Sequence, residues 1–228
     1  MPALLTPTVF SANIIKSTDI IKLASTKDQV VVSMHKELLC FFSPYYSAAL
    51  NGKFLEAQKD QFKVDLSGEQ LQSFATWIYT GKCDLSDRWA PYIYLYVFAD
   101  QVDIIALRRD ILRWLVRSRD TLADYSSTRL ILRNVTQHSQ LYKWMLDSYV
   151  AHWDPSCDAT DPCMLNSDKD PDHLLANFIY QILKGIAVRD KAHNPANLSD
   201  CSCCNKICEY HEHESKEEWE ASKLTQSV

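Results

Sequence analysis

Residues 30–81 decide the fold, and they read VVVSMHKELLCFFSPYYSAALNGKFLEAQKDQFKVDLSGEQLQSFATWIYTG. Their first five residues are mostly apolar and β-branched, and so is the run 20–24, from which a polar loop separates them. Two such runs joined by a short polar loop are typical of a β-hairpin. At His35 the pattern becomes helical, so the sequence predicts a hairpin that leads directly into a helix.

Short end signals predict the next helix. Ser43 directly precedes Pro44, and serine is a favoured N-cap, while proline is favoured at the first helical position. Asn51 and Gly52 close the same segment, which predicts a left-handed C-cap. We therefore expect a short helix over 45–50.

A strand and a longer helix complete the stretch. Residues 62–66 alternate between apolar and polar side chains, as in a half-buried strand. Ser67 and Gln70 then form the S-x-x-Q pattern of a capping box. Apolar residues recur behind it at helical spacing, and Gly81 ends the helix. These apolar residues are Leu71, Phe74, Ala75 and Ile78.

Helical patterns continue after residue 88. Residues 89–98 are rich in aromatic side chains, and Asp103 is expected to cap a second helix, which carries an arginine row that we expect to be solvated. The row is Arg108, Arg109, Arg113 and Arg117. A last helix is expected over 173–189. Its expected inward-facing residues are Leu174, Leu175, Phe178, Ile179, Ile182 and Leu183.

This order of strands and helices resembles the BTB (POZ) domain. The resemblance covers residues 17–118 and rests on the ordered series through Tyr79-Thr80-Gly81, with Asp19 before the first strand and His35 after the second. Three further segments are similar to fungal BTB-domain proteins in particular: 95–109, 149–153 and 208–213. The resemblance implies an α+β fold, in which a BTB/POZ domain with a small three-stranded sheet and a cluster of helices precedes an all-helical C-terminal extension.

The predicted organisation has four parts. Residues 1–16 form a flexible N-terminus, and residues 17–118 form the BTB/POZ domain. A helical extension follows over 119–195, with an acidic loop at 154–172 that contains six aspartates and three prolines. A Cys/His-rich tail, predicted to be partly disordered, occupies residues 196–228.

Composition limits the function classes. The 228-residue chain has a net charge of −5, which argues against nucleic acid as a partner, because phosphate binding needs clustered Lys and Arg. Only four glycines are present, which argues against a Gly-rich phosphate loop. Neither a signal peptide nor a membrane-spanning segment is recognisable. We therefore expect an intracellular protein, cytoplasmic or nuclear, that does not bind membranes.

His35 and Cys40 could be read as a catalytic base and nucleophile, but this interpretation is disfavoured. Five residues apart in one helix, they do not share an edge, and no Gly-rich oxyanion turn lies nearby. A hydrogen-bonded histidine at a helix start and a small buried cysteine are the favoured interpretation. We expect no catalytic residues and no enzymatic activity.

Phe54-Leu55-Glu56 is the candidate partner-binding motif. In BTB proteins that recruit the cullin scaffolds of ubiquitin ligases, a hydrophobic-x-Glu motif follows the Ser-Pro helix, and this triplet matches that position. The resemblance thus implies that Phe54 fills a pocket of a cullin while Glu56 pairs with the same partner. The alternative is that Phe54 covers the edge of the domain's own core and that Glu56 is solvated.

The tail is dense in the residue types that bind zinc. A tetrahedral zinc site needs four ligands, usually Cys and His. The candidate ligands are Cys201, Cys204, Cys208 and His211, with Cys203 and His213 as substitutes. A distant ligand could come from His152, Cys157 or Cys163. The alternative is a near-terminal tail with incidental cysteines, and no cofactor other than zinc is expected.

These patterns favour a non-catalytic protein–protein interaction adaptor, with a substrate adaptor for a cullin-based ubiquitin ligase as its concrete form. Two alternatives stay open: a self-associating scaffold without a ligase link, and a zinc-binding protein that acts through its Cys/His tail. An adaptor needs a second surface for its client. No recognisable client-binding module, such as a propeller or a finger array, follows the BTB-like part.

Overall fold

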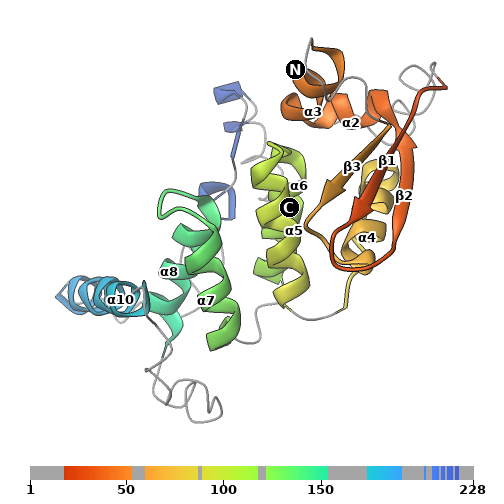
Figure 1. The fold of residues 1–228 in the computed structure, drawn as a ribbon. Coiled ribbons are helices and arrows are strands. Elements are labelled where there is room, and N and C mark those ends of the chain that lie inside the picture. The colour runs from red at the N-terminus through yellow and green to blue at the C-terminus, as the bar shows by residue number, and fades with distance from the viewer. Residues whose placement is uncertain are drawn as a thin grey trace. The chain divides into compact units, whose positions relative to one another are not determined.

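The protein has an α+β fold with a three-stranded mixed sheet in the computed structural model (Figure 1). The structure describes residues 18–52, 60–86, 89–117, 122–153 and 174–191 and, in the tail, residues 203, 207–210, 212–213, 215–217 and 219–220. Eight α-helices lie within these described residues. The chain divides into two compact units, a first unit of residues 1–111 and a second unit of residues 112–228.

The first unit contains the sheet, with the strand order β2-β1-β3. β1 (Ile20–Ser25) pairs antiparallel with β2 (Val31–His35) and parallel with β3 (Gln61–Val64). Side chains alternate between the two faces of a strand, and the inner face carries the fully buried Leu23 and Met34. The predicted hairpin and the later strand are confirmed.

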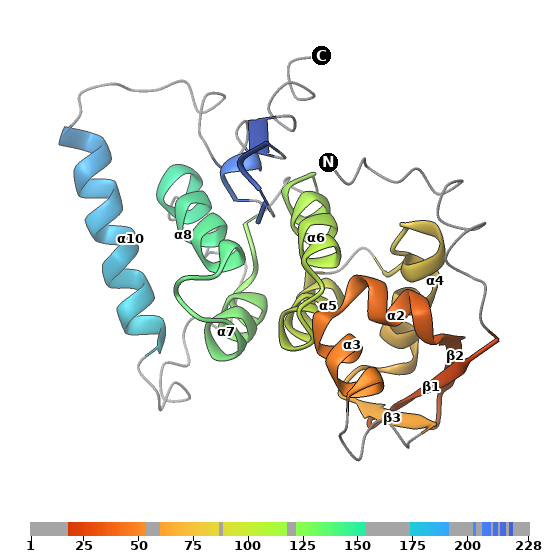
Figure 2. The same cartoon turned by 90° about the horizontal axis from the view of Figure 1, so that it is seen from above.

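Four helices lie wholly within the first unit (Figure 2). They are α2 (Lys36–Phe42), α3 (Pro44–Asn51), α4 (Gly68–Thr80) and α5 (Trp89–Gln101). Ser43 caps α3 by accepting from the Tyr46 backbone N–H at 3.1 Å. Ser67 and Gln70 form the predicted capping box of α4, and Gly81, at a φ of 70°, ends that helix.

Ser43 has a second contact that the sequence did not predict. Its hydroxyl donates to the Val102 carbonyl at 2.5 Å, and the side chain is fully buried. One hydroxyl therefore caps α3 and joins the start of that helix to the turn that follows α5.

The predicted left-handed C-cap at Asn51-Gly52 is wrong. Asn51 is the last residue of α3, and Gly52 is extended, with a φ of −81° and a ψ of −174°. The Gly52 N–H donates to the Ala48 carbonyl at 2.9 Å, so the helix ends on an ordinary backbone hydrogen bond. Glycine allows a positive φ without requiring it, so the Asn51-Gly52 dipeptide does not by itself specify a left-handed C-cap.

Asp28 joins the hairpin loop to the start of α4. Its carboxylate accepts from the Gly68 backbone N–H at 2.5 Å and from the Val30 backbone N–H at 3.0 Å. These two hydrogen bonds, the one from Gly68 foremost, hold the pKa of Asp28 below its ordinary value. A Cβ at Gly68 would lie 2.5 Å from Val30 Cγ2, so the close approach requires glycine.

The start of α6 (Ile105–Arg117) differs from the prediction. Asp103, predicted as the cap, has a φ of 52°, and its carboxylate accepts from Arg108 Nη2 at 3.3 Å. Arg108 also lies 3.5 Å from Asp100 Oδ1 and is only 6% exposed, so the expectation of a solvated arginine is wrong for this residue. A guanidinium can be buried here because two carboxylates pair with it.

Beyond the end of α6, the second unit has three long described helices. They are α7 (Tyr125–Asn134), α8 (Gln140–His152) and α10 (Leu174–Lys191). Asp124 caps α7 and Ser139 caps α8 through hydrogen bonds from backbone N–H groups. Five large apolar residues of α7 and α8 are buried: Ile131, Leu141, Trp144, Met145 and Tyr149. The predicted acidic loop, 154–172, lies outside the described residues.

α10 buries a narrower face than predicted. Phe178 and Ile182 are buried, but Ile179 and Leu183, also expected to face inward, are 40% and 57% exposed. The prediction is wrong for these two residues. Consecutive residues of a helix lie about 100° apart around its axis, so a run of apolar residues does not have to share one face.

Close contact between α8 and α10 depends on Gly185. A Cβ at this position would lie 2.5 Å from Val150 Cγ2, so a larger side chain would push the helices apart. Near the end of α10, Arg189 Nη1 donates to the Val150 carbonyl at 2.7 Å. The Phe178 ring packs edge-on against the Tyr149 ring, with 5.3 Å between their centroids. These contacts determine which face of α10 is covered.

Candidate functional site

Much of the predicted site lies outside the described residues. Phe54-Leu55-Glu56 belongs to the connection between α3 and β3, of which residues 53–59 are not described. Three predicted zinc ligands are also outside: Cys201, Cys204 and His211. The structure does describe Cys203, Cys208 and His213. Candidate sites are therefore argued from the described residues around these positions.

The corner between α2 and α3 exposes two aromatic rings, Phe41 and Tyr45, which we call the aromatic corner. Phe41 is 50% exposed and Tyr45 is 51% exposed. Their neighbours in the chain turn inward: the Phe42 ring lies 5.0 Å from the Trp77 ring, and Tyr46 is buried. Exposed aromatic rings on regular helices are typical of protein-interface anchors.

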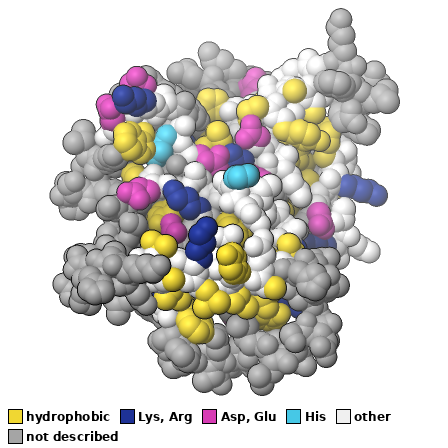
Figure 3. Space-filling model, turned by 90° about the vertical axis from the view of Figure 1, so that its left-hand side faces the viewer, with side chains coloured by type: hydrophobic (Ala, Val, Ile, Leu, Met, Phe, Trp, Pro, Cys, Tyr) yellow, Lys and Arg dark blue, Asp and Glu magenta, His cyan; other side chains and the backbone are white. Residues whose placement is uncertain are grey.

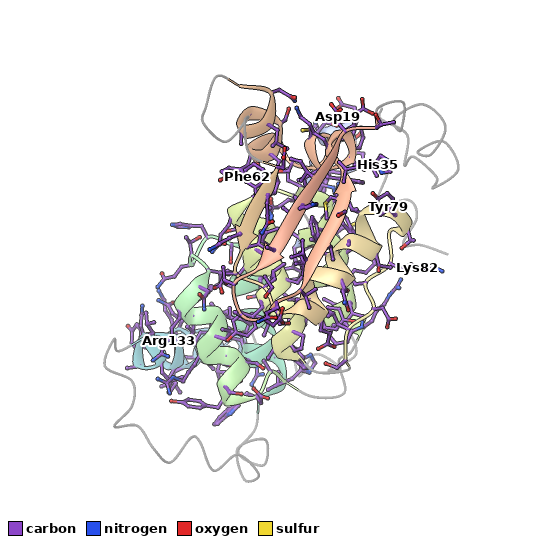
Figure 4. All side chains as sticks on the ribbon, turned by 45° about the vertical axis from the view of Figure 1, so that its right-hand side comes forward. Asp19, His35, Phe62, Tyr79, Lys82 and Arg133 are labelled. Atoms are coloured by element: carbon purple, nitrogen blue, oxygen red, sulfur yellow. The ribbon has the colours of Figure 1, made fainter. Side chains whose placement is uncertain are left out.

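His35 and Tyr79 form a hydrogen-bonded pair at one end of the sheet, where Figure 4 shows them near Asp19. His35 Nδ1 lies 2.8 Å from the Tyr79 hydroxyl oxygen, and the His35 backbone N–H donates to the same oxygen at 3.0 Å. The prediction of a hydrogen-bonded histidine at the helix start is confirmed. Its ring is held by a tyrosine of α4.

Cys40 lies in an environment that does not activate a thiol. Its Sγ lies 3.8 Å from the Tyr46 carbonyl oxygen and 3.7 Å from Asn51 Nδ2. Burial raises the pKa of the Cys40 thiol, with a smaller opposing effect from the charge of Lys36. Burial also raises the pKa of Cys83, to about 12. A cysteine nucleophile needs the opposite shift, because the thiolate is the reactive form.

α10 exposes a row of apolar side chains on the side opposite its buried face. This row, which we call the α10 stripe, consists of Ala176, Ile179, Tyr180, Leu183 and Ala187. The five residues fall within about 100° around the helix axis, and Tyr180 is 64% exposed. Figure 3 faces the α10 side of the second unit and shows a band of hydrophobic side chains. The sequence could have indicated this stripe, because the apolar residues from Leu174 to Leu183 extend around more of the helix than one buried face can cover.

Two described tail residues, Cys203 and Tyr210, form hydrogen bonds with α8. Cys203, Cys208 and Tyr210 are all buried. The Trp144 indole N–H donates to the Cys203 carbonyl at 3.2 Å, and the Tyr210 hydroxyl donates to Asp147 Oδ2 at 2.9 Å. Burial, together with the charge of Asp147, raises the pKa of Tyr210. These tail residues are therefore part of the core of the second unit.

His152, the last residue of α8, meets the tail directly. Its Nε2 lies 3.3 Å from Cys203 Sγ, although the two residues are 51 positions apart. The structure thus brings together two of the predicted zinc ligands: His152, proposed as a distant ligand, and Cys203, proposed as a substitute ligand. Elsewhere in the tail, His213 Nε2 lies 3.3 Å from the Cys208 carbonyl oxygen. Within the described part of the chain, no three His, Cys, Asp or Glu side chains form a group that could hold a metal ion.

Three features stand out on the described residues: the aromatic corner, the α10 stripe and the His152–Cys203 pair. The first two are suited to contact with another protein, and the third joins two residue types that bind soft metal ions. None of the described helices is both long and apolar enough to cross a membrane. No protein-family model matches this chain, and a search of curated proteins found no match to it.

Proposed function

We propose that the chain is a non-catalytic protein–protein interaction adaptor built on a BTB-type domain. The element order of the first unit supports this proposal: a hairpin, two short helices, a third strand that pairs with the first, and a capped helix. The observation that carries it is an exposed apolar surface on each unit, the aromatic corner on the first and the α10 stripe on the second. An adaptor needs two such surfaces, one for its scaffold and one for its client.

A cullin of a ubiquitin ligase is the scaffold that we propose for the first unit. The resemblance of Phe54-Leu55-Glu56 to the cullin-binding motif supports this choice. In this proposal Phe54 is the buried anchor and Glu56 the charged partner, while Phe41 and Tyr45 extend the contact. A few anchors of this kind usually supply most of the binding energy of an interface.

The Phe54→Ala/Glu56→Ala double variant is expected to bind the N-terminal region of a cullin about thirtyfold more weakly than the unchanged chain. Loss of one anchor costs about 2 kcal/mol, which corresponds to that factor. Titration calorimetry with the purified chains measures both dissociation constants, and circular dichroism checks that the variant is folded.

A Tyr180→Ser variant serves as the control for this measurement. It changes an exposed residue of α10, so we expect it to bind the cullin as the unchanged chain does. If the unchanged chain does not bind a cullin, the proposal that it is an adaptor of a cullin-based ubiquitin ligase is wrong. If the double variant binds as well as the unchanged chain, the contact site is elsewhere.

The α10 stripe favours a second candidate function, a self-associating scaffold. Four of its five residues are symmetrically spaced, because Ala176 precedes Tyr180 by four positions and Leu183 precedes Ala187 by four. Two antiparallel copies of α10 would place Tyr180 beside Leu183 of the other copy, and Ala176 beside Ala187. A two-fold symmetric interface requires such self-matching.

The scaffold function predicts that the chain has twice its monomer mass of 26.2 kDa at micromolar concentration. Leu183→Glu should return it to the monomer, because the substitution places a charge in the middle of an apolar contact. Light scattering after gel filtration measures both masses. Asn177→Glu adds the same charge to an exposed position of α10 outside the stripe, and it should leave the mass unchanged. If the unchanged chain is a monomer, the scaffold function is contradicted. The α10 stripe is then available to bind a client protein, which favours the adaptor function.

A further inference from the structure

We propose that the free edge of β2 binds an extended acidic segment of another protein, which adds a further strand to the sheet. Neither the aromatic corner nor the α10 stripe includes this edge, so the inference goes beyond the proposed function. β2 is an outer strand of the sheet, in which β1 lies in the centre. An outer strand can pair with another strand through the backbone groups that its neighbour in the sheet does not use.

The hydrogen bonds at the two ends of the hairpin show which backbone groups of β2 point outward. The Ser25 N–H donates to the Val30 carbonyl at 2.9 Å, and the Lys36 N–H donates to the Asp19 carbonyl at 2.9 Å. In an antiparallel pair, residues that bond to the neighbouring strand alternate with residues whose N–H and C=O groups point away from it. The residues of β2 that point away from β1 are therefore Val31, Ser33 and His35.

Tyr79 occupies one end of this edge, and the remainder is open. The His35 N–H donates to the Tyr79 hydroxyl oxygen at 3.0 Å, which is independent evidence that His35 points outward. Within the described part of the chain, the outward backbone groups of Val31 and Ser33 form no hydrogen bond. Val31 is 48% exposed, and Ser33 is exposed as well. These two residues therefore offer their N–H and C=O groups to an incoming strand.

β2 lacks the features that usually prevent pairing at an outer strand. Such strands are typically very short, or they carry lysine or proline. Residues 30–34 read VVVSM and contain neither lysine nor proline. β3, the other outer strand, has only four residues, and one of them is Lys63. Of the two edges, β2 is therefore the one that is suited to pair with a partner.

The exposed face of the sheet indicates that the partner is acidic. Lys22 and Lys63 are both exposed on it, and none of the three strands contains Asp or Glu. Neither lysine forms an ion pair with any residue that the structure describes. Lys22 lies opposite Ser33, whose short side chain leaves room for the lysine to extend over it. A glutamate of the added strand, about 10 Å from β1, would then be within reach of Lys22.

A dye-labelled seven-residue peptide in which glutamate and valine alternate tests this proposal. We expect the unchanged chain to bind it with a micromolar Kd at low salt, measured by fluorescence anisotropy. The same peptide with lysine in place of glutamate should bind at least about tenfold more weakly, because like charges then face Lys22. An N-methylated form of the acidic peptide keeps the side chains but lacks backbone donors, so it should not bind.

Val31→Pro tests the edge itself. Val31 is the first residue of β2, and its N–H bonds to no described residue, so proline removes a donor that the sheet does not use. We expect this variant to bind the acidic peptide about tenfold more weakly. Val31→Thr keeps the N–H and the β-branched shape, and as the matched control it should bind as the unchanged chain does. Circular dichroism checks that both variants are folded.

Lys22→Glu tests the charge of the exposed face without changing the edge. We expect about fivefold weaker binding of the acidic peptide, because an ion pair is replaced by a repulsion. Arg133→Glu makes the same change of charge on an exposed residue of the second unit, and it should have no effect. Amide hydrogen exchange gives a second readout, since the exchange of Val31 and Ser33 should slow when the peptide is bound.

Four outcomes would overturn the proposal. An unchanged chain that does not bind the acidic peptide has no such site, and equal binding of the acidic and lysine peptides excludes the role of charge. Full binding by a folded Val31→Pro variant places the site elsewhere. A dimer that Val31→Pro, but not Leu183→Glu, converts to a monomer shows that a second copy occupies the edge. None of these outcomes affects the cullin measurement, which concerns Phe54 and Glu56.

Discussion

Replacement of Phe74 by alanine is expected to lower the free energy of unfolding by about 3–5 kcal/mol. Phe74 lies fully buried in α4, with its ring edge-on to Phe98 at 5.1 Å and near Trp77 at 6.4 Å between centroids. The substitution removes the ring from this cluster and leaves a cavity that the neighbours only partly fill. Urea unfolding followed by circular dichroism measures the change.

Phe41→Ala is the matched control, since it removes the same atoms from a half-exposed site at the aromatic corner. Surface substitutions usually change stability by about 0.5 kcal/mol, so we expect a loss below about 1 kcal/mol. Equal losses in the two variants would contradict the assignment of Phe74 to the core. A folded Phe41→Ala variant also gives a direct test of the aromatic corner in partner binding.

Ser43→Ala is expected to cost about 2–4 kcal/mol of unfolding free energy. Loss of an N-cap costs about 0.5–2 kcal/mol, and α3 loses its cap when the hydroxyl is removed. The Val102 carbonyl also loses a buried donor, which costs about 1–3 kcal/mol more. Because one hydroxyl serves both groups, a single substitution removes both contacts. Urea unfolding again measures the sum.

Ser67→Ala separates the two contributions to the effect at Ser43. Ser67 caps α4 within a capping box, and its side chain is only half-buried. We expect a loss of about 1 kcal/mol there. The excess loss in Ser43→Ala over Ser67→Ala then estimates the contact with Val102. If the two losses are equal, the buried hydrogen bond contributes nothing measurable.

Signals that act over a few residues could be predicted from the sequence. Ser43 before Pro44 and Ser67 before Gln70 specify helix starts through hydrogen bonds that span three positions, and the structure contains both. The hairpin likewise follows from two apolar runs and a polar loop. Asn51-Gly52 shows the limit of this approach, because its residues permit a left-handed cap without enforcing one.

Features that depend on distant residues were not predictable in the same way. Arg108 appeared to belong to a solvated row, yet its burial depends on how Asp100 and Asp103 are placed by the turn before α6. The exposure of Leu183 depends on which face of α10 meets α8. Local patterns give the apolar residues of a helix but not the side that its neighbours cover.

The candidate sites also differ in whether local sequence or distant contacts define them. The sequence identified the Cys/His tail by composition, and only the fold brings His152 to Cys203. It gave no indication of the aromatic corner, because Phe41 and Phe42 are chemically alike and differ only in the direction in which each side chain points. The motif at 54–56 remains a prediction that the cullin measurement tests.

The docking of the tail on α8 has a consequence for newly made chains. Cys203 follows its contact Trp144 by 59 positions, and Tyr210 follows Asp147 by 63. At a translation rate of about 5–20 residues per second, the ribosome synthesises these tail residues about 3–13 s after the α8 residues that they contact. During that interval the nascent chain presents an apolar helix face to its surroundings. We therefore expect this face of α8 to be a chaperone-binding segment of the nascent chain.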